Sequence, residues 1–272
     1  MRIRVIFFLL SVAGLGFAQS PVISNNGMVN AASFTTPIAP GSLFSIFGSG
    51  LASSVATADS IPLSKSLGGV TVEFIQGNNT FNAALLFVQP DDAAKNITSQ
   101  INAQVPWEVD PTQQTQVKVT VNGNSSAPVQ APVAASGPGI FASNGFAIAV
   151  NNDGTLTWAP GTVPGLTTHG AKAGDTIIVY TTGLGSVGPA PPADGADSID
   201  ELRRTTATPI VLVGGVPAPL PLPFSGLTPQ FVGVYQINVT IPDGVTPGWN
   251  VPLQLQIGGI TTANNTIIAI TQ

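Results

Sequence analysis

An acidic segment, DGADSIDE at residues 194–201, groups several oxygen ligands within eight positions. Its carboxylates belong to Asp194, Asp197, Asp200 and Glu201. Carboxylate and carbonyl oxygens are the ligands that Ca²⁺ prefers, so the segment is a candidate metal site for calcium. Its spacing does not match a helix–loop–helix calcium site, and a solvated acidic loop is the simpler interpretation. Both alternatives stay open at this point, with the solvated loop favoured.

The tryptophans offer a different chemistry, the stacking of an aromatic ring on a sugar. Trp107, Trp158 and Trp249 are the candidate ligand-binding residues, and the chain is rich in Asn, Gln and Thr side chains that could hydrogen-bond a glycan. The alternative is packing, because buried aromatic side chains dominate the energetics of protein cores. On that interpretation Trp107 and Trp249 pack at the ends of strands.

Residues that could support catalysis are sparse. His169 is the one histidine of the chain, whereas zinc needs three or four His, Cys or carboxylate ligands. The segment GLGSVG at residues 183–188 matches a dinucleotide-binding glycine pattern, but prolines follow where a helix is required. A glycosidase pair could come from Glu73, Glu108 or the acidic segment, yet nothing places two of these carboxylates together. We therefore expect no catalytic residues, no cofactor and a protein that is not an enzyme.

Composition narrows the partner class. Only 8% of the residues are charged, against about 25% in an average soluble domain, and the net charge is −5. Eight Lys and Arg residues leave no basic stripe, so we expect no nucleic-acid partner. The chain has no cysteine and thus no disulfide. The uncharged stretch at residues 205–242 contains seven prolines, which predicts short strands and turns rather than a membrane-spanning helix.

The first residues have the features of a signal peptide. Arg2 and Arg4 precede an apolar run at residues 5–15, and small residues follow before a predicted cleavage after Ala18. The apolar run is shorter than the roughly 20 residues that span a bilayer. We expect residues 1–18 to be removed on export, which leaves an extracellular or cell-surface protein without a membrane span.

Several segments recur in the same order along the chain. The pattern Gln-Ile-Asn, two residues, an aliphatic residue and Pro occurs at residues 100–106 and again at 236–242. VKVTVNG at 117–123 resembles LQLQIGG at 253–259, and GSLFSIFGSGL at 41–51 resembles GDTIIVYTTGL at 174–184. GGV occurs at 68–70 and at 214–216. This order predicts an internal duplication, with unequal segments at 70–100 and 184–214 as the places for specific function.

The recurring segments have the alternation of β-strands. Apolar residues at 117, 119 and 121 share one face of a strand, and Lys118 and Thr120 share the other. Gly and Pro separate such strands, and NNDG at 151–154 predicts a hairpin turn. Short helices are expected only at 91–96, where Asp91 and Asp92 would cap the helix, and at 197–204. We expect an all-β fold of two tandem immunoglobulin-like β-sandwich domains, residues 19–134 and 135–272.

Particular segments also resemble a known family. The segments are VNAASFTTPIAPGSLFSIFGSGLA at 29–52, LGGV at 67–70, QINAQVPWEV at 100–109, GPGIFA at 137–142, TTGLGSVGP at 181–189 and VGVYQINVTIP at 232–242. Together they are similar to the uncharacterised Solibacter-type C-terminal domain family of exported bacterial proteins. Each half is more distantly similar to the immunoglobulin-like modules of plexins and transcription factors. The resemblance implies no catalytic residues.

These observations predict a secreted, non-catalytic interaction or structural module of the bacterial cell surface or extracellular space. Its expected partner is an extracellular glycan or a surface protein. A carbohydrate-binding module is the first alternative, supported by the three tryptophans, and a hydrolase of unrecognised type is the second.

Overall fold

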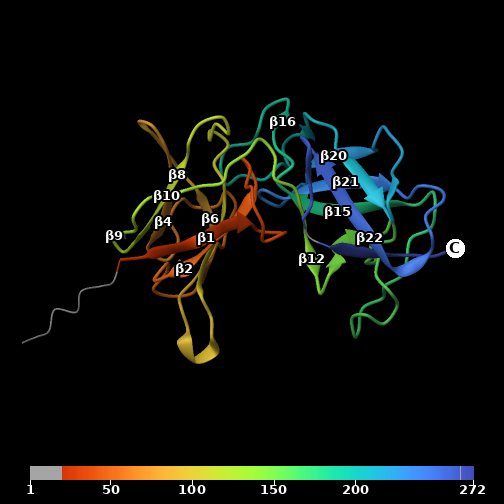
Figure 1. Cartoon of the computed structure of the whole chain (residues 1–272), viewed down its shortest axis with the longest axis horizontal. Helices are drawn as coiled ribbons and strands as arrows, with labels where there is room; N and C mark the ends of the chain where they lie inside the picture. Colours follow the sequence, from red (N-terminus) through yellow and green to blue (C-terminus); the bar gives the residue numbers. More distant parts are fainter. Residues whose placement is uncertain (1–19, 264) are drawn as a thin grey trace, which may run out of the picture.

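The computed structural model describes residues 20–263 and 265–272, so the predicted signal peptide lies outside the described residues. Within the described part, the regular elements are β-strands and one short 3₁₀ helix, which confirms the prediction of an all-β fold. The strands of residues 22–130 and those of residues 139–270 form separate sheets, which lie side by side along the longest axis of the molecule (Figure 1). No helix in the described ranges is both long and apolar enough to cross a membrane.

Two antiparallel sheets make up the first half. One sheet has the order β1 (Val22–Asn30), β2 (Leu43–Ser49), β7 (Ser99–Gln104), β6 (Ala84–Gln89) and β3 (Ala56–Thr57). The other has the order β10 (Val129–Gln130), β8 (Gln116–Val121), β4 (Val70–Gln76) and β5 (Asn79–Asn82), with β9 (Asn124–Ser125) also paired to β8.

Two further sheets make up the second half. One runs β11 (Gly139–Ile140), β15 (Thr176–Thr182), β21 (Tyr235–Thr240), β20 (Phe224–Leu227), β17 (Arg204–Thr205) and β16 (Val187–Gly188), with β14 (Ala149–Val150) also on β15. The other runs β12 (Ala142–Ser143), β13 (Phe146–Ala147), β24 (Thr266–Ile270), β22 (Gly248–Ile257), β18 (Ile210–Val213) and β19 (Val216–Pro217), with β23 (Ile260–Thr261) also on β22.

Alternating side chains explain how the sheets of each half pack. In β8 the residues Val117, Val119 and Val121 are buried, while the residues between them are partly exposed, as the sequence pattern predicts. The apolar faces of both sheets of the first half contribute to one core. Phe44 of β2 and Phe74 of β4 meet across it edge to face, with ring centroids 5.4 Å apart. A second core fills the other half in the same way.

The central strands of the two halves pair in the same register. Ser45 of β2 lies opposite Asn102 of β7, and Ile178 of β15 lies opposite Asn238 of β21. Residue 178 follows residue 45 by 133 positions, and residue 238 follows residue 102 by 136, which are the spacings of the recurring sequence segments. The two Gln-Ile-Asn segments therefore occupy equivalent strands, each between two antiparallel neighbours.

The predicted equivalence of the two GGV segments is wrong. Phe74 of β4 pairs with Val117, and Val213 of β18 pairs with Leu253, so the ends of β4 and β18 correspond. Gly68 lies before β4, whereas Gly214 lies in the turn after β18. Both glycines have positive φ, which many tight turns require. The two GGV segments are therefore alike because each forms a tight turn, and they occupy different positions in the fold.

The minor elements agree with the sequence in part. A 3₁₀ helix, η1 (Ala93–Lys95), forms within residues 91–96, and the Asp92 side chain accepts a hydrogen bond from the Lys95 amide as its N-cap. The predicted turn at 151–154 is present, closed by the hydrogen bond from the Gly154 amide to the Asn151 carbonyl. The helix expected at 197–204 is absent, because this segment bends around the buried side chain of Arg203.

Candidate binding sites

The acidic segment begins at the junction between the two halves. The Asp194 carboxylate accepts a hydrogen bond from the Trp107 amide (3.0 Å) and lies 3.1 Å from the Lys65 ammonium, and its side chain is only 4% exposed. Trp107 and Lys65 both belong to the first half. Asp194 therefore faces protein donors rather than solvent.

Gly195 completes this contact. Its amide donates to the Gln104 side chain (2.7 Å), and its carbonyl accepts from the Leu63 amide (2.8 Å). Gly195 has a φ of +75°, and a Cβ there would lie 2.6 Å from the Leu63 carbonyl oxygen. We call Asp194 and Gly195, with their partners Leu63, Lys65, Gln104 and Trp107 in the first half, the 194–195 latch.

The other carboxylates of the acidic segment point elsewhere. Asp200 accepts two hydrogen bonds from the Arg203 guanidinium (2.6 and 3.1 Å), and these bonds hold the pKa of Asp200 below its usual value. Glu201 lies 3.6 Å from the same guanidinium, and Asp197 is partly exposed. The structure does not bring the four carboxylates together. In residues 20–263 and 265–272, no group of three or more His, Cys, Asp or Glu residues could hold a metal ion.

The three tryptophans differ sharply in environment. Trp158 is 5% exposed, and its indole N–H donates to the Ala147 carbonyl (2.6 Å), so its ring is part of the protein interior. Trp107 is partly buried and packs against the core of the second half, although it belongs to the first. Among the described residues, its indole nitrogen is a buried donor without a hydrogen-bond partner. Trp249 is 49% exposed, so it alone of the three presents a large part of its ring to solvent.

Trp249 lies beside a hollow of about 420 Å³. The hollow is lined by Gly214, Thr246, Pro247, Gly248, Trp249, Asn250, Val251 and Pro252. Thr246, Pro247 and Asn250 are exposed, and no charged side chain is among the lining residues. We call Thr246, Pro247, Trp249 and Asn250 the Trp249 shelf.

A second hollow, of about 490 Å³, opens at the junction next to the latch. It is lined by Leu43, Ala58, Asp59, Ser60, Ile61, Leu63 and Leu86 from the first half and by Gln230, Phe231, Val232 and Val234 from the second. Ile61 and Phe231 are 46% and 57% exposed. Mostly apolar hollows at domain junctions are common ligand sites. No sequence pattern predicts this hollow, because its walls come from segments far apart in the chain.

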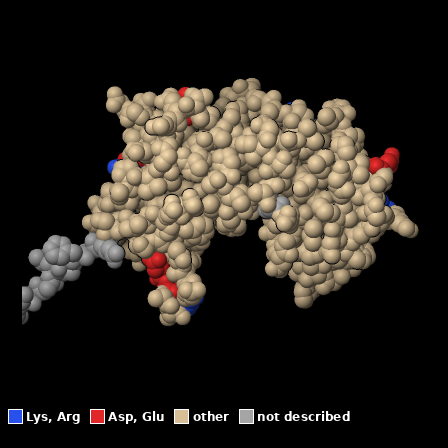
Figure 2. Space-filling model, in the orientation of Figure 1, with Lys and Arg blue, Asp and Glu red and all other residues tan. Residues whose placement is uncertain are grey.

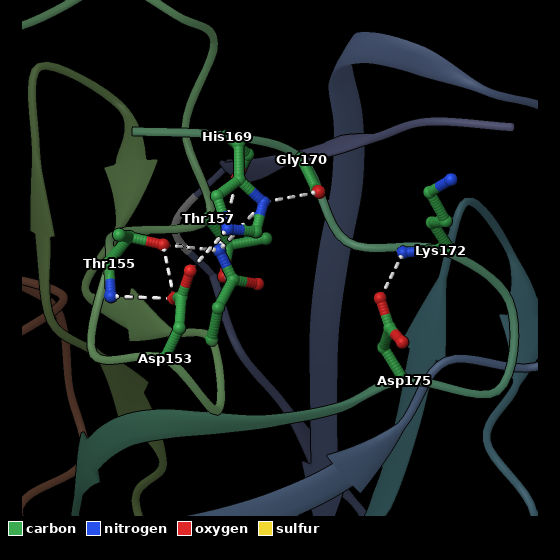
Figure 3. A network of polar contacts seen from close by, with 8 residues as sticks. Asp153, Thr155, Thr157, His169, Gly170, Lys172 and Asp175 are labelled. Atoms are coloured by element: carbon green, nitrogen blue, oxygen red, sulfur yellow. Dashed lines mark hydrogen bonds and ion pairs between the residues drawn. The ribbon is translucent and has the colours of Figure 1, made fainter. Parts of the chain in front are cut away.

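His169 takes part in a polar network with the turn at residues 151–155 (Figure 3). One imidazole nitrogen lies 2.9 Å from the Gly170 carbonyl oxygen and the other 2.9 Å from the Asp153 carboxylate. A neutral imidazole has a single N–H, so only the protonated ring donates to both acceptors. The Gly170 carbonyl, and then Asp153, raise the pKa of His169 above 6.5. Hydrogen bonds from Thr155, and then His169, lower the pKa of Asp153.

The face of the molecule seen in Figure 2 carries few charges. In the space-filling view, red and blue atoms form a few small groups on the visible face, and most of that face is neutral (Figure 2). A neutral surface of this kind favours ligands recognised by apolar contact and neutral hydrogen bonds over ligands recognised by charge.

No family model matches the chain, and no curated protein matches it. Among solved structures, it is similar to the surface glycan-binding protein PbSGBP-B from Prevotella bryantii, with 11% identity and a TM-score of 0.26. That alignment covers 91% of this chain and 41% of the Prevotella protein, so the chain spans less than half of its length. A titin structure, Titin-A168169, matches with 11% identity and a TM-score of 0.21 over 93% of this chain and 100% of the titin chain. Likenesses of this size say nothing about what this chain binds.

Proposed function

We propose that this chain is an exported, non-catalytic binding module made of two immunoglobulin-like β-sandwich domains. Residues 19–134 form the first domain and residues 135–272 the second, and residues 1–18 are the signal peptide. The shared register of β2 with β7 and of β15 with β21 supports an origin by internal duplication. The partner is an extracellular glycan or a surface protein, and it is not a nucleic acid.

The 194–195 latch is the observation that carries this proposal. The Asp194 carboxylate accepts from the Trp107 amide, and the Gly195 backbone bonds Gln104 and Leu63, so both residues take the place of solvent for partners in the other half. Such contacts fix one sandwich against the other, and a fixed pair presents surface from both halves, including the hollow at the junction. Independent domains on a flexible linker would need no such contacts.

A binding screen of the mature protein, residues 19–272, tests the proposal. The panel contains purified bacterial cell-wall preparations, soluble polysaccharides and surface proteins, each measured with and without calcium. We expect saturable binding without turnover of the ligand. Turnover that disappears when one carboxylate, such as Asp153 or Glu73, is replaced by its amide would contradict the proposal and support the hydrolase alternative.

Carbohydrate binding is the second candidate function, and the exposure of Trp249 favours it. An aromatic ring beside neutral polar side chains suits a ligand that has both apolar faces and hydroxyl groups. Retention of the mature protein by a polysaccharide, lost on Trp249→Ala, would support this candidate over a protein partner.

A further inference from the structure

The position of Trp249 conflicts with the alternation of its own strand. Along β22 the odd-numbered residues Val251, Leu253, Leu255 and Ile257 are buried. Continued alternation would turn residue 249 toward the same core, which is the environment that a tryptophan ordinarily prefers. Instead Trp249 is 49% exposed.

A bulge in the ladder with β24 explains this exposure. Gly248 pairs with Ile270 and Val251 pairs with Ile268, so three steps on β22 correspond to two on β24. One extra residue on β22 reverses the facing of the positions before it. Trp249 and Asn250 are consequently exposed one after the other, which regular pleating does not allow. Bulges of this kind often re-aim a side chain beside a functional site.

The groups beside the ring define the chemistry of a ligand. Among the described residues, no hydrogen bond of the protein engages the side chains of Thr246 or Asn250 or the indole N–H of Trp249. A hydroxyl, an amide and an indole donor are thus available around one aromatic face. No charged side chain lines the hollow, so the site has no group to pair with a phosphate or a carboxylate.

We propose that the Trp249 shelf binds a neutral pyranose unit of an extracellular glycan, with one face of the sugar on the Trp249 ring and its hydroxyl groups on Asn250 and Thr246. A pyranose ring offers an axial C–H face to the indole and an equatorial rim of hydroxyls to the polar side chains. The proposal rests on the binding function proposed above and names its ligand class and site.

Affinity electrophoresis of the mature protein in gels that contain soluble neutral polysaccharides (a β-glucan, a xylan, a galactomannan and an α-glucan) tests the proposal. We expect at least one polysaccharide to retard the wild type. Trp249→Ala should weaken that binding at least tenfold, Trp249→Phe less, and Asn250→Ala about threefold. The exposed aromatic Phe34, which lines neither hollow, provides the control, because Phe34→Ala should leave the affinity unchanged. Circular dichroism of each variant verifies the fold.

A second readout locates the sugar. Binding should shift the tryptophan fluorescence of the wild type, and Trp249→Phe should abolish the shift, since Trp158 is buried and Trp107 is held at the junction. Absence of retardation by every polysaccharide, or equal affinity of the wild type and Trp249→Ala, would overturn the proposal. In the second case binding persists, so the site would be wrong while the binding function stands. If the protein bound a surface protein but no polysaccharide, the proposed binding function would stand and the proposed glycan ligand would be wrong.

Discussion

The 194–195 latch can be tested by removing its carboxylate. In Asp194→Ala the Trp107 amide loses its acceptor at 3.0 Å, and the Lys65 ammonium loses its partner at 3.1 Å. An amide left without a partner away from water costs about 1–3 kcal/mol. The ion pair adds at most about 1 kcal/mol, because the Lys65 side chain is half exposed. We expect Asp194→Ala to lower the free energy of unfolding by about 2–3 kcal/mol.

Asp194→Asn separates the two contributions. The amide oxygen of Asn can still accept from the Trp107 N–H, while the charge that attracts Lys65 is gone. We expect this variant to lose less than about 1 kcal/mol. Asp197→Ala, three residues along in the same segment, is the control and should lie within about 0.5 kcal/mol of the wild type.

Urea unfolding followed by circular dichroism and by tryptophan fluorescence measures these values. If the latch joins the halves, the wild type unfolds in one transition with coincident probes, and Asp194→Ala shifts the midpoint or splits the transition. For a chain of this size a loss of 2–3 kcal/mol corresponds to roughly 4–12 °C in Tm. A wild-type midpoint for Asp194→Ala, or an equal loss in Asp194→Asn, would refute the reasoning from the hydrogen bond.

Three further predictions concern single sites. Gly195→Ala should lower the free energy of unfolding by about 2–4 kcal/mol, because the new Cβ would meet a backbone carbonyl. Gly123 has a similar positive φ but open space around it, so Gly123→Ala should lower the free energy of unfolding by only about 1 kcal/mol. Thermal unfolding of the two variants tests this difference. NMR titration of the sole histidine should give a pKa above 6.5 for His169, and this pKa should fall in Asp153→Asn. The network should stabilise the fold fully below pH 6.5 and lose that effect as the pH rises through the raised pKa. An unchanged pKa in Asp153→Asn would contradict the ion pair. Burial raises the pKa of Tyr235, whose hydroxyl donates to a backbone carbonyl at 2.6 Å, so Tyr235→Phe should cost about 1–2 kcal/mol in urea unfolding, and a neutral effect would argue against that bond.

The strands could be predicted because their signal is local. Alternation in β8, in β21 and along most of β22 comes from side chains that face one core, so the printed order of apolar and polar residues is enough. The short cap at Asp92 and the turn at 151–154 also depend on neighbours in sequence. The spacings of 133 and 136 between recurring segments likewise matched the register of the paired strands, whereas the spacing of the GGV segments did not.

The candidate binding surfaces could be predicted only in part, because most of their contacts join residues far apart in the chain. Asp194 was a reasonable calcium ligand by composition, but its donors are Trp107 and Lys65, which no local pattern connects to it. Arg203 differs, because its buried guanidinium bonds residues close in sequence, and the segment at 197–204 bends around it instead of forming a helix. Trp249 was one of three candidate tryptophans. The bulge in β22 explains why Trp249 is exposed while Trp158 is buried, and no sequence pattern predicts that bulge.

The proposed function depends most directly on one fixed arrangement of the two halves, to which the 194–195 latch contributes. Because the chain has no cysteine, a Thr80→Cys, Gln254→Cys variant can carry one spin label on β5 and one on β22, both at exposed positions. Double electron–electron resonance on this variant should give a single narrow distribution of the distance between the two labels. Adding Asp194→Ala and Gly195→Ala should broaden that distribution. A distribution that is already broad with the latch intact would contradict the central claim.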